Sequence, residues 1–270
     1  MWRGIEAGKN LLSYMAVVHK NGSPLFYHGL RLFLYWGTYS MIVFLILTMF
    51  LGGHARNNFI IWIFLTFMGL VITINRSGIY FSGAYGEHKA LSKLKKELSD
   101  DFHIYVNVKV HEKMESDMVI VGPTGVFDVE VKNYNGTLEG GRDDKEWILH
   151  KTGQKGGTYS KTIRNPINQL KRNVFILAKF LKIEGSNVWV DGAILFPNGH
   201  TAWRSPNLNL AECYTSAQAV AREIKKTVPR RPISQDQLNK IHASLEKCIN
   251  GQGITKKDFD ALTLDKPKIR

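Results

Sequence analysis

The sequence predicts an α/β protein in which a mixed β-sheet flanked by helices follows a two-helix transmembrane hairpin. Three observations support this prediction. Two long apolar stretches without charge lie in the amino-terminal third of the chain. After residue 86, short apolar or alternating runs typical of strands follow one another. Longer segments with apolar residues three and four positions apart, typical of amphipathic helices, lie before, between and after those runs.

The hairpin is predicted by two neighbouring uncharged stretches. The first covers residues 32–53, and about 20 apolar residues suffice to cross the hydrocarbon core of a bilayer. The second covers residues 57–75, and Arg76 can extend it by reaching towards the lipid headgroups. The link between them is too short to be a domain. We therefore expect a transmembrane helical hairpin over residues 32–75, in preference to a buried helical hairpin of a soluble protein.

Basic residues predict the orientation of this hairpin, because Lys and Arg gather on the cytoplasmic side of a membrane. The connecting loop holds Arg56 as its one Lys or Arg, whereas both flanks hold several. Both ends of the chain should therefore be cytoplasmic, and residues 1–31 should form a cytoplasmic amino-terminal segment. This orientation predicts a multi-pass protein of the inner or cytoplasmic membrane, with its carboxy-terminal domain in the cytoplasm.

The rest of the chain is expected to contain a helix, five strands, a helix, a strand, an optional short strand and two closing helices. We expect the main domain to cover residues 82–200, with residues 201–270 completing or flanking it, and a mobile Gly-rich loop at residues 153–157. The expected helices are residues 87–98, 165–182, 216–227 and 234–248, and the expected strands are residues 104–110, 117–121, 126–131, 136–139, 147–151 and 188–196.

The charge balance is compatible with two explanations. The formal net charge is +13, and residues 87–270 carry +8 of it. A basic domain suits a polyanion such as nucleic acid, but excess cytoplasmic Lys and Arg in a membrane protein would give the same balance. The two cysteines, Cys213 and Cys248, lie far apart without a CxxC partner. They argue against a disulfide framework or a zinc site and predict reduced thiols in a cytosolic domain.

The most informative segment is residues 116–134, which read SDMVIVGPTGVFDVEVKNY. A turn at residues 122–125 would fold Asp117 back towards Glu130 and Lys132, which lie two apart and so share one face of a strand. Taken singly, an Asp near a turn and a Glu-x-Lys on a strand are common. Together, two carboxylates and a lysine suit a metal-dependent phosphodiesterase. The carboxylates would hold Mg²⁺ or Mn²⁺, and the lysine would orient the attacking water or stabilise the transition state.

With these residues assembled, the chain from about residue 82 to 197 resembles the NERD, or nuclease-related, domain. That family is placed in the PD-(D/E)xK restriction-endonuclease-like superfamily. The resemblance implies a restriction-endonuclease-like mixed sheet flanked by helices, with Asp117 and Glu130 as metal ligands and catalytic roles for Asp117, Glu130, Lys132 and Gln169. It rests on four blocks in order, which are Gly86-Glu87, Asp117 with VIVGPTG, GVFDVEVKNYNG, and Asn165-Pro166-Ile167-Asn168-Gln169.

Two further acidic residues and Gln169 each have two interpretations. The resemblance implies that Glu87 is another acid of the metal site, yet an acid at a helix start also suits the helix dipole. Asp128 stands where family members usually carry an apolar residue. It shares a face with Glu130, so it is either a third acidic ligand or a residue at the solvent edge beyond the site, and we favour the second. Gln169 faces the active site by resemblance, although it would also suit solvent.

Basic residues gather around the start of the helix expected at residues 165–182. Asn165 suits the N-cap position of that helix, and a helix N-terminus attracts anions. The basic cluster is therefore a candidate site for DNA phosphates, although a solvated basic face is equally compatible. Its members are Lys161, Arg164, Lys171 and Arg172.

Together these observations predict a membrane-anchored nuclease that uses Mg²⁺ or Mn²⁺ to hydrolyse phosphodiester bonds in DNA. Its expected partners are nucleic acid and the lipid bilayer. One alternative is a non-catalytic, membrane-tethered nucleic-acid-binding module, and another is a membrane scaffold that acts through its hairpin. The presence of Asp117, Glu130 and Lys132 together favours the enzyme, because binding alone does not require all three.

Overall fold

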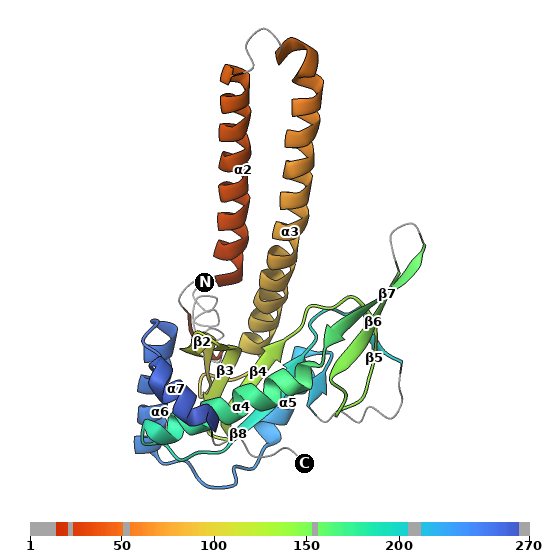
Figure 1. Cartoon of the computed structure of the whole chain (residues 1–270). Coiled ribbons are helices and arrows are strands. Elements are labelled where there is room, and N and C mark those ends of the chain that lie inside the picture. The colour runs from red at the N-terminus through yellow and green to blue at the C-terminus, as the bar shows by residue number, and fades with distance from the viewer. Residues whose placement is uncertain (1–14, 21–23, 51–54, 153–155, 205–211, 265–270) are drawn as a thin grey trace, which may run out of the picture. The chain divides into compact units, whose positions relative to one another are not determined.

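The computed structural model describes residues 15–20, 24–50, 55–152, 156–204 and 212–264. The chain divides into two compact units. One comprises Gly22–Tyr85 and is a pair of helices. The other comprises Met1–Asn21 together with Gly86–Arg270, and it contains both β-sheets and the remaining helices (Figure 1).

The helical unit is formed by α2 (Pro24–Phe50) and the first part of α3 (Ala55–Glu97). The rings of Phe26 and Phe81 lie 5.6 Å apart. Gly29 of α2 lies so near α3 that a Cβ atom at this glycine would come within 3.2 Å of the Tyr80 Cβ. The two helices therefore pack against each other as an antiparallel hairpin, with the start of α2 beside the later part of α3.

The predicted helical hairpin is thus present, but its predicted role as a transmembrane element is not supported. In the parts of the chain that the structure describes, no helix combines the length and the apolar character needed to cross a membrane. One difference from the expected hairpin lies in α3. This helix does not end near residue 75 but continues through the charged segment after Gly86 to Glu97.

The larger sheet has six strands in the order β1-β2-β3-β4-β8-β10. Its central strands β2, β3 and β4 are antiparallel, whereas β1, β8 and β10 run parallel to the strands they pair with. The sheet is therefore mixed, as predicted. Its strands are β1 (Val17–His19), β2 (His103–His111), β3 (Met114–Gly122), β4 (Gly125–Val131), β8 (Val190–Leu195) and β10 (Cys213–Tyr214).

The smaller sheet has four strands in the order β7-β6-β5-β9. The sequence predicted β5 and β6 as strands but missed β1 and β7, and its one optional short strand accounts for only one of β9 and β10. Nearly every side chain of β7 is exposed, so this strand lacks an apolar alternation, and β1 and β9 have three residues each. The predicted loop at 153–157 falls largely on residues 153–155, outside the described residues. The strands are β5 (Gly136–Glu139), β6 (Glu146–Thr152), β7 (Thr158–Arg164) and β9 (Thr201–Trp203).

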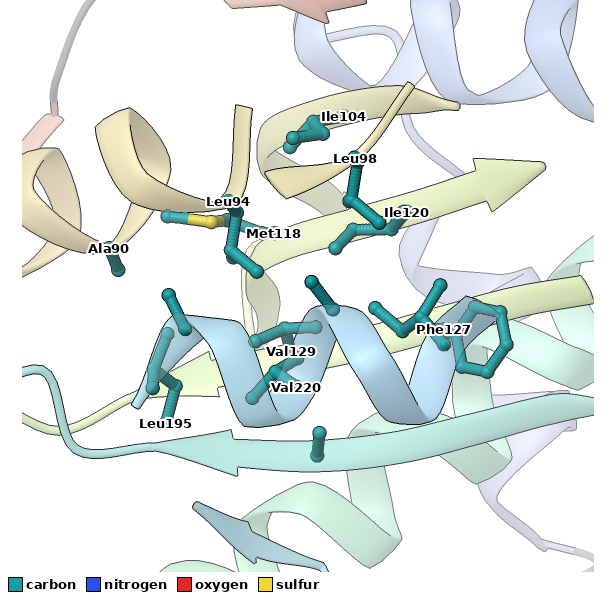
Figure 2. Close-up of a cluster of buried hydrophobic side chains, with 14 of the residues drawn as sticks. Ala90, Leu94, Leu98, Ile104, Met118, Ile120, Phe127, Val129, Leu195 and Val220 are labelled. Carbon is teal, nitrogen blue, oxygen red and sulfur yellow. The ribbon is translucent and has the colours of Figure 1, made fainter. Parts of the chain in front are cut away.

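Helices cover both faces of the larger sheet. On one face, Leu94 of α3 and Val220 of α5 join a buried cluster with Phe127 and Val129 of β4 (Figure 2). On the other face, Val126 packs in a cluster with residues of α4, α6 and α7. Since strand residues alternate between faces, Asp128 and Glu130 share the face of Val126. The remaining helices are α4 (Pro166–Ile183), α5 (Ala217–Lys226), α6 (Gln235–Ile249) and α7 (Lys256–Leu264).

The start of α4 is fixed as predicted, with Asn165 as its N-cap. The Asn165 Oδ1 accepts a hydrogen bond from the Ile167 amide at 2.9 Å, and its Nδ2 donates to the Asp144 carbonyl at 2.7 Å. Pro166 occupies the first turn, where its missing N–H costs nothing. The cap therefore both starts the helix and ties down the preceding loop, which leaves Gln169 one turn into α4.

Candidate functional site

The β3–β4 hairpin brings Asp117 beside Glu130. The predicted turn is present, with Gly122 paired to Gly125, which has a φ of 142° that favours glycine. From this turn the register continues to the pair of Met118 and Val129, so Asp117 lies across from Glu130. The Asp117 Oδ2 accepts a hydrogen bond from the Val131 amide at 2.7 Å. The acid of β3 is thereby fastened to the end of β4.

On the other side of Asp117, strand β2 is irregular. Asn107 stands across from Asp117 in the β2–β3 register and has a φ of 58°, a backbone conformation that few residues other than glycine adopt. Val106 belongs to the core beneath α3 and α5, whereas Val108 belongs to the core beneath α4. Two residues that should share a face therefore point to opposite faces, so the sheet changes its alternation beside Asp117. Irregularities of this kind are common next to active sites.

Glu130, Lys132 and Gln169 form a closed set of hydrogen bonds. The Glu130 Oε1 accepts from the Lys132 Nζ at 2.5 Å and from the Gln169 Nε2 at 2.6 Å. The Lys132 Nζ also donates to the Gln169 Oε1 at 3.1 Å. The Gln169 amide therefore binds the carboxylate with one atom and the ammonium with the other. This contact joins α4 to the end of β4.

Asn173 completes the hydrogen bonding of Glu130, and the sequence analysis missed it. Its side chain is only 3% exposed. Its Nδ2 donates to the Glu130 Oε2 at 3.4 Å and to the Glu115 carbonyl at 3.1 Å. Residues four apart share one face of a helix, so the position of Asn173 four residues after Gln169 was the available indication that it also faces Glu130.

The electrostatics of the pair formed by Asp117 and Glu130 follow from burial and from their proximity. Burial and the Asp117 charge raise the pKa of Glu130 to about 7, against the opposing effects of Lys132 and Gln169. Burial also raises the pKa of Asp117, while Lys132, the Val131 amide and a hydrogen bond with Glu130 work to lower it. Both carboxyl groups therefore bind a proton more readily than a carboxyl group in water does.

Lys132 keeps its charge in this site. Burial lowers the pKa of Lys132, but the charges of Glu130 and Asp117 outweigh burial and raise it above its ordinary value. The ammonium is therefore protonated at neutral pH. It can donate hydrogen bonds and stabilise negative charge, and it is not a base that would take a proton from water.

Glu87 lies within electrostatic reach of the same group. It is 8% exposed, and burial, followed by the charges of Asp117, Glu115 and Glu130, raises its pKa to about 8. Glu87 is accordingly mostly protonated at neutral pH. Because α3 runs from Ala55 to Glu97, Glu87 lies inside a helix and not at a helix start, so the helix-dipole interpretation is wrong. Its proposed part in the metal site stays a prediction.

The interpretation of Asp128 as a solvent-edge residue is wrong, because the structure buries it completely. Its side chain shares the α4 face of the sheet with Glu130, and neither of its carboxyl oxygens has a hydrogen-bond partner within the described structure. Burial and the Glu130 charge raise its pKa well above the ordinary value, against the effect of nearby Ser116. A neutral, protonated Asp128 is the form that this surrounding favours.

The four predicted nucleic-acid-binding residues lie on two elements, β7 and α4. Arg172 follows Gln169 by three residues on the same side of α4, and its guanidinium donates to the Lys113 carbonyl. Lys171 is directed elsewhere on α4 and lies 3.7 Å from Asp143. Lys161 and Arg164 are exposed on β7, in the smaller sheet. Of these four, Arg172 is the one that shares the helix face of Gln169.

The predicted ligand set of Asp117, Glu130 and Glu87 is not assembled as a ready-made metal site. Within the described residues, no group of three or more His, Cys, Asp or Glu side chains is arranged to hold a metal ion. One reason is that the Glu130 Oε1 is engaged by Lys132 and Gln169. Two carboxylates nevertheless fit Mg²⁺, which usually binds one or two of them and keeps several waters. The raised pKa of Glu130 comes first from burial and then from the charge of Asp117, which a bound cation would offset.

The fold and the site define an α/β domain that carries a cluster of acids and a lysine around the end of β4. Residues 82–197 match the NERD family, described as the nuclease-related domain. This match supports the assignment of that part of the chain to the family and indicates a nuclease-related function. No curated protein and no solved structure gave a significant match.

Proposed function

We propose that the protein is a metal-dependent nuclease that hydrolyses phosphodiester bonds in DNA. The observation that carries this proposal is the hydrogen-bonded set of Glu130, Lys132 and Gln169 beside Asp117, inside the segment that matches the nuclease-related domain. Four polar side chains from β3, from β4 and its end, and from α4 meet there. Apolar side chains of the same shape could fill this space without the cost of burying polar groups, so packing alone does not explain them.

The residues of the chain have distinct parts in this proposal. Asp117 and Glu130 would hold Mg²⁺ or Mn²⁺, with Glu87 in support, and the bound cation would lower the pKa of a water and neutralise phosphate charge. Lys132, protonated at neutral pH, would stabilise the negative charge that develops on the phosphate. Gln169 would hold Lys132 and Glu130 at a fixed separation through its two hydrogen bonds.

DNA is the proposed substrate because the chain is basic and the site is acidic. The net charge of +13 favours a polyanion, whereas the acids at the site require a cation before a phosphate can approach them. Arg172, on the Gln169 side of α4, is the basic residue best placed for the phosphates beside the reacting bond. Lys161, Arg164 and Lys171 would contact more distant parts of the DNA.

Cleavage assays with the full chain test the proposal. We expect hydrolysis of single- or double-stranded DNA that needs Mg²⁺ or Mn²⁺ and falls about 100-fold or more in Glu130→Gln and Lys132→Ala, while DNA binding persists. The matched control is Asn168→Leu, because the Asn168 amide binds the Asp144 carbonyl instead of the site. A protein that binds DNA but cleaves none with either metal would be a non-catalytic binding module. One that neither binds nor cleaves DNA would point to a scaffold.

We also propose that the hairpin of α2 and α3 attaches the protein to the inner or cytoplasmic membrane, with the larger unit in the cytoplasm. Large apolar side chains that are exposed on both helices support this, and exposed apolar surface of this kind marks contact with lipid or with a partner. They include Leu34, Tyr35, Met41, Ile42, Phe64 and Phe67.

Fractionation and labelling test this attachment. The protein should sediment with membranes after alkaline carbonate treatment. A cysteine introduced at Asn57 should react with an impermeant thiol reagent on intact cells, and one introduced at Lys266 should not. Release by carbonate would remove the membrane attachment from the proposal, and the reverse labelling pattern would invert the orientation.

A further inference from the structure

We propose that Asn173 is a positioning residue that sets the Glu130 carboxylate relative to the strand of Asp117 and so determines the affinity of the site for a divalent cation. This inference rests on the proposed function, because it assumes that Asp117 and Glu130 hold the cation. It adds a residue of α4 that the predicted site does not contain.

The geometry of the Asn173 amide carries the inference. Its Nδ2 makes two hydrogen bonds to two different strands, to the Glu115 carbonyl of β3 at 3.1 Å and to the Glu130 Oε2 of β4 at 3.4 Å. Glu115 lies two residues before Asp117, on the same strand. One amide group therefore links the main chain beside the first acid to the side chain of the second.

Two side-chain amides of α4 each bind a different oxygen of the Glu130 carboxylate. Gln169 donates to the Oε1, and Asn173 donates to the Oε2. With one oxygen held by each residue, rotation of the carboxylate about its last side-chain bond would break at least one contact. Without Asn173, the Oε1 would remain held by Lys132 and Gln169, and the Oε2 would lose the hydrogen bond from the Asn173 amide.

The burial of Asn173 indicates that packing alone does not explain why this position carries an amide. Asn173 is 3% exposed and lies one turn before Ile176, in the α4 face that covers the sheet. A leucine of similar size would fill this space without the cost of burying a polar group. The buried amide is compensated by the two hydrogen bonds it makes, one to the Glu130 carboxylate and one to the main chain two residues before Asp117.

Residues that orient a metal ligand typically change metal affinity by about 10- to 100-fold when they are removed. We therefore expect Asn173→Leu to weaken binding of Mn²⁺ by about tenfold or more, although the variant keeps Asp117, Glu130 and Lys132. Asn173→Gln retains an amide donor on the same helix face and should recover part of the loss. Asn168→Leu, on the exposed side of α4, should bind Mn²⁺ as the wild type does.

Titration calorimetry of the full chain with Mn²⁺ tests the inference, with thermal unfolding of each metal-free variant measured in parallel. Weaker binding by Asn173→Leu, with a melting temperature close to that of Asn168→Leu and partial recovery in Asn173→Gln, would support it. If Asn173→Leu does not fold, the Mn²⁺ affinities of Asn173→Gln and Asn173→Ser are compared with that of the wild type instead. The inference then requires both variants to bind Mn²⁺ less tightly than the wild type. Equal affinity in all folded variants would overturn the inference alone. A wild type that binds no Mn²⁺ would overturn both the inference and the proposed metal site.

Discussion

The Lys132 ammonium lies 2.5 Å from the Glu130 carboxylate. Glu130 belongs to β4 and Lys132 directly follows this strand, so the two side chains point to the same face. The carboxyl side chain is 1% exposed and the lysine side chain is 20% exposed. The lysine therefore brings a positive charge to an acid that is removed from water. This pairing explains how Glu130 can titrate near neutral pH in spite of its burial and the neighbouring Asp117.

Removal of the lysine charge should destabilise the protein more strongly at pH 8 than at pH 6. In Lys132→Met, Glu130 loses the cation that lowers its pKa, so its folded-state pKa rises above about 7. At pH 6 Glu130 is mostly protonated, so the loss of the lysine charge costs little. At pH 8 the variant must either bury an ionised Glu130 without its lysine or take up a proton from a solution that holds few, and both reduce stability. We expect an additional loss of about 1–3 kcal/mol at pH 8, measured by urea unfolding. Lys132→Arg, which keeps the charge, is the control, and an equal loss at both pH values would contradict the prediction.

The histidines where β1, β2 and α6 meet should make the protein sensitive to acid. His19 and His103 share a hydrogen bond of 3.0 Å, and the Tyr105 hydroxyl lies 2.7 Å from the His242 Nδ1. Burial and the neighbouring imidazoles lower the pKa of His103 and His242 below 6.5, while Glu246 acts in the opposite direction. Because the unfolded chain then binds more protons, their contribution to stability is complete above pH 6.5 and falls as the pH drops below it.

Urea unfolding at pH 7 and pH 5.5 measures this effect. The double variant His103→Gln with His242→Gln should lose less stability between the two pH values than the wild type does. His88→Gln is the control, since His88 is exposed at the start of the α3 segment that belongs to the larger unit. A wild type and a double variant with the same acid sensitivity would show that these imidazoles do not cause it.

The sequence predicts the part of the site that depends on local register. A four-residue turn sets Asp117 against Glu130, and strand alternation places Lys132 on the same face, so both follow from spacing alone. Asn173 could not be predicted in this way, because its contact with Glu130 joins residues 43 positions apart. Asp128 shows the corresponding limit. Alternation predicts its face correctly, but the burial of that face depends on how α4 packs over the sheet.

A similar division applies to the fold. The strands with apolar alternation and the helices α4, α5 and α6 were predicted within a few residues. The helix predicted at residues 87–98 is instead the end of the much longer α3, and α7 was not predicted. Strand β7 was missed because its exposed, polar residues form an edge of the smaller sheet. The hairpin helices were predicted, but their predicted passage through a membrane is not supported within the described residues. Apolar composition thus predicted the helices and did not determine what surrounds them.

Neutralisation of Glu87 should stabilise the metal-free protein at alkaline pH. The pKa of Glu87 is raised from its ordinary value of 4.5 to about 8, first by burial and then by Asp117, Glu115 and Glu130. Between these two pH values the folded state holds a proton that the unfolded chain releases, so stability falls as the pH rises from 4.5 towards 8. Glu87→Gln removes this dependence, and at pH 8 it should raise the free energy of unfolding by a few kcal/mol, on the order of 1.4 kcal/mol for each pH unit of the raised pKa.

Thermal unfolding in EDTA at several pH values between 5 and 8 checks this prediction, with Glu112→Gln as the control because Glu112 is exposed in the turn between β2 and β3. Mg²⁺ provides a second measurement. A cation held by Asp117 and Glu130 would offset the acidic repulsion that raises the Glu87 pKa, so Mg²⁺ should stabilise the wild type more at pH 8 than at pH 6. The difference in stability between Glu87→Gln and the wild type should shrink in its presence. A wild type whose stability does not fall towards pH 8, or a Glu87→Gln variant with the same fall, would show that Glu87 does not carry the proton assigned to it.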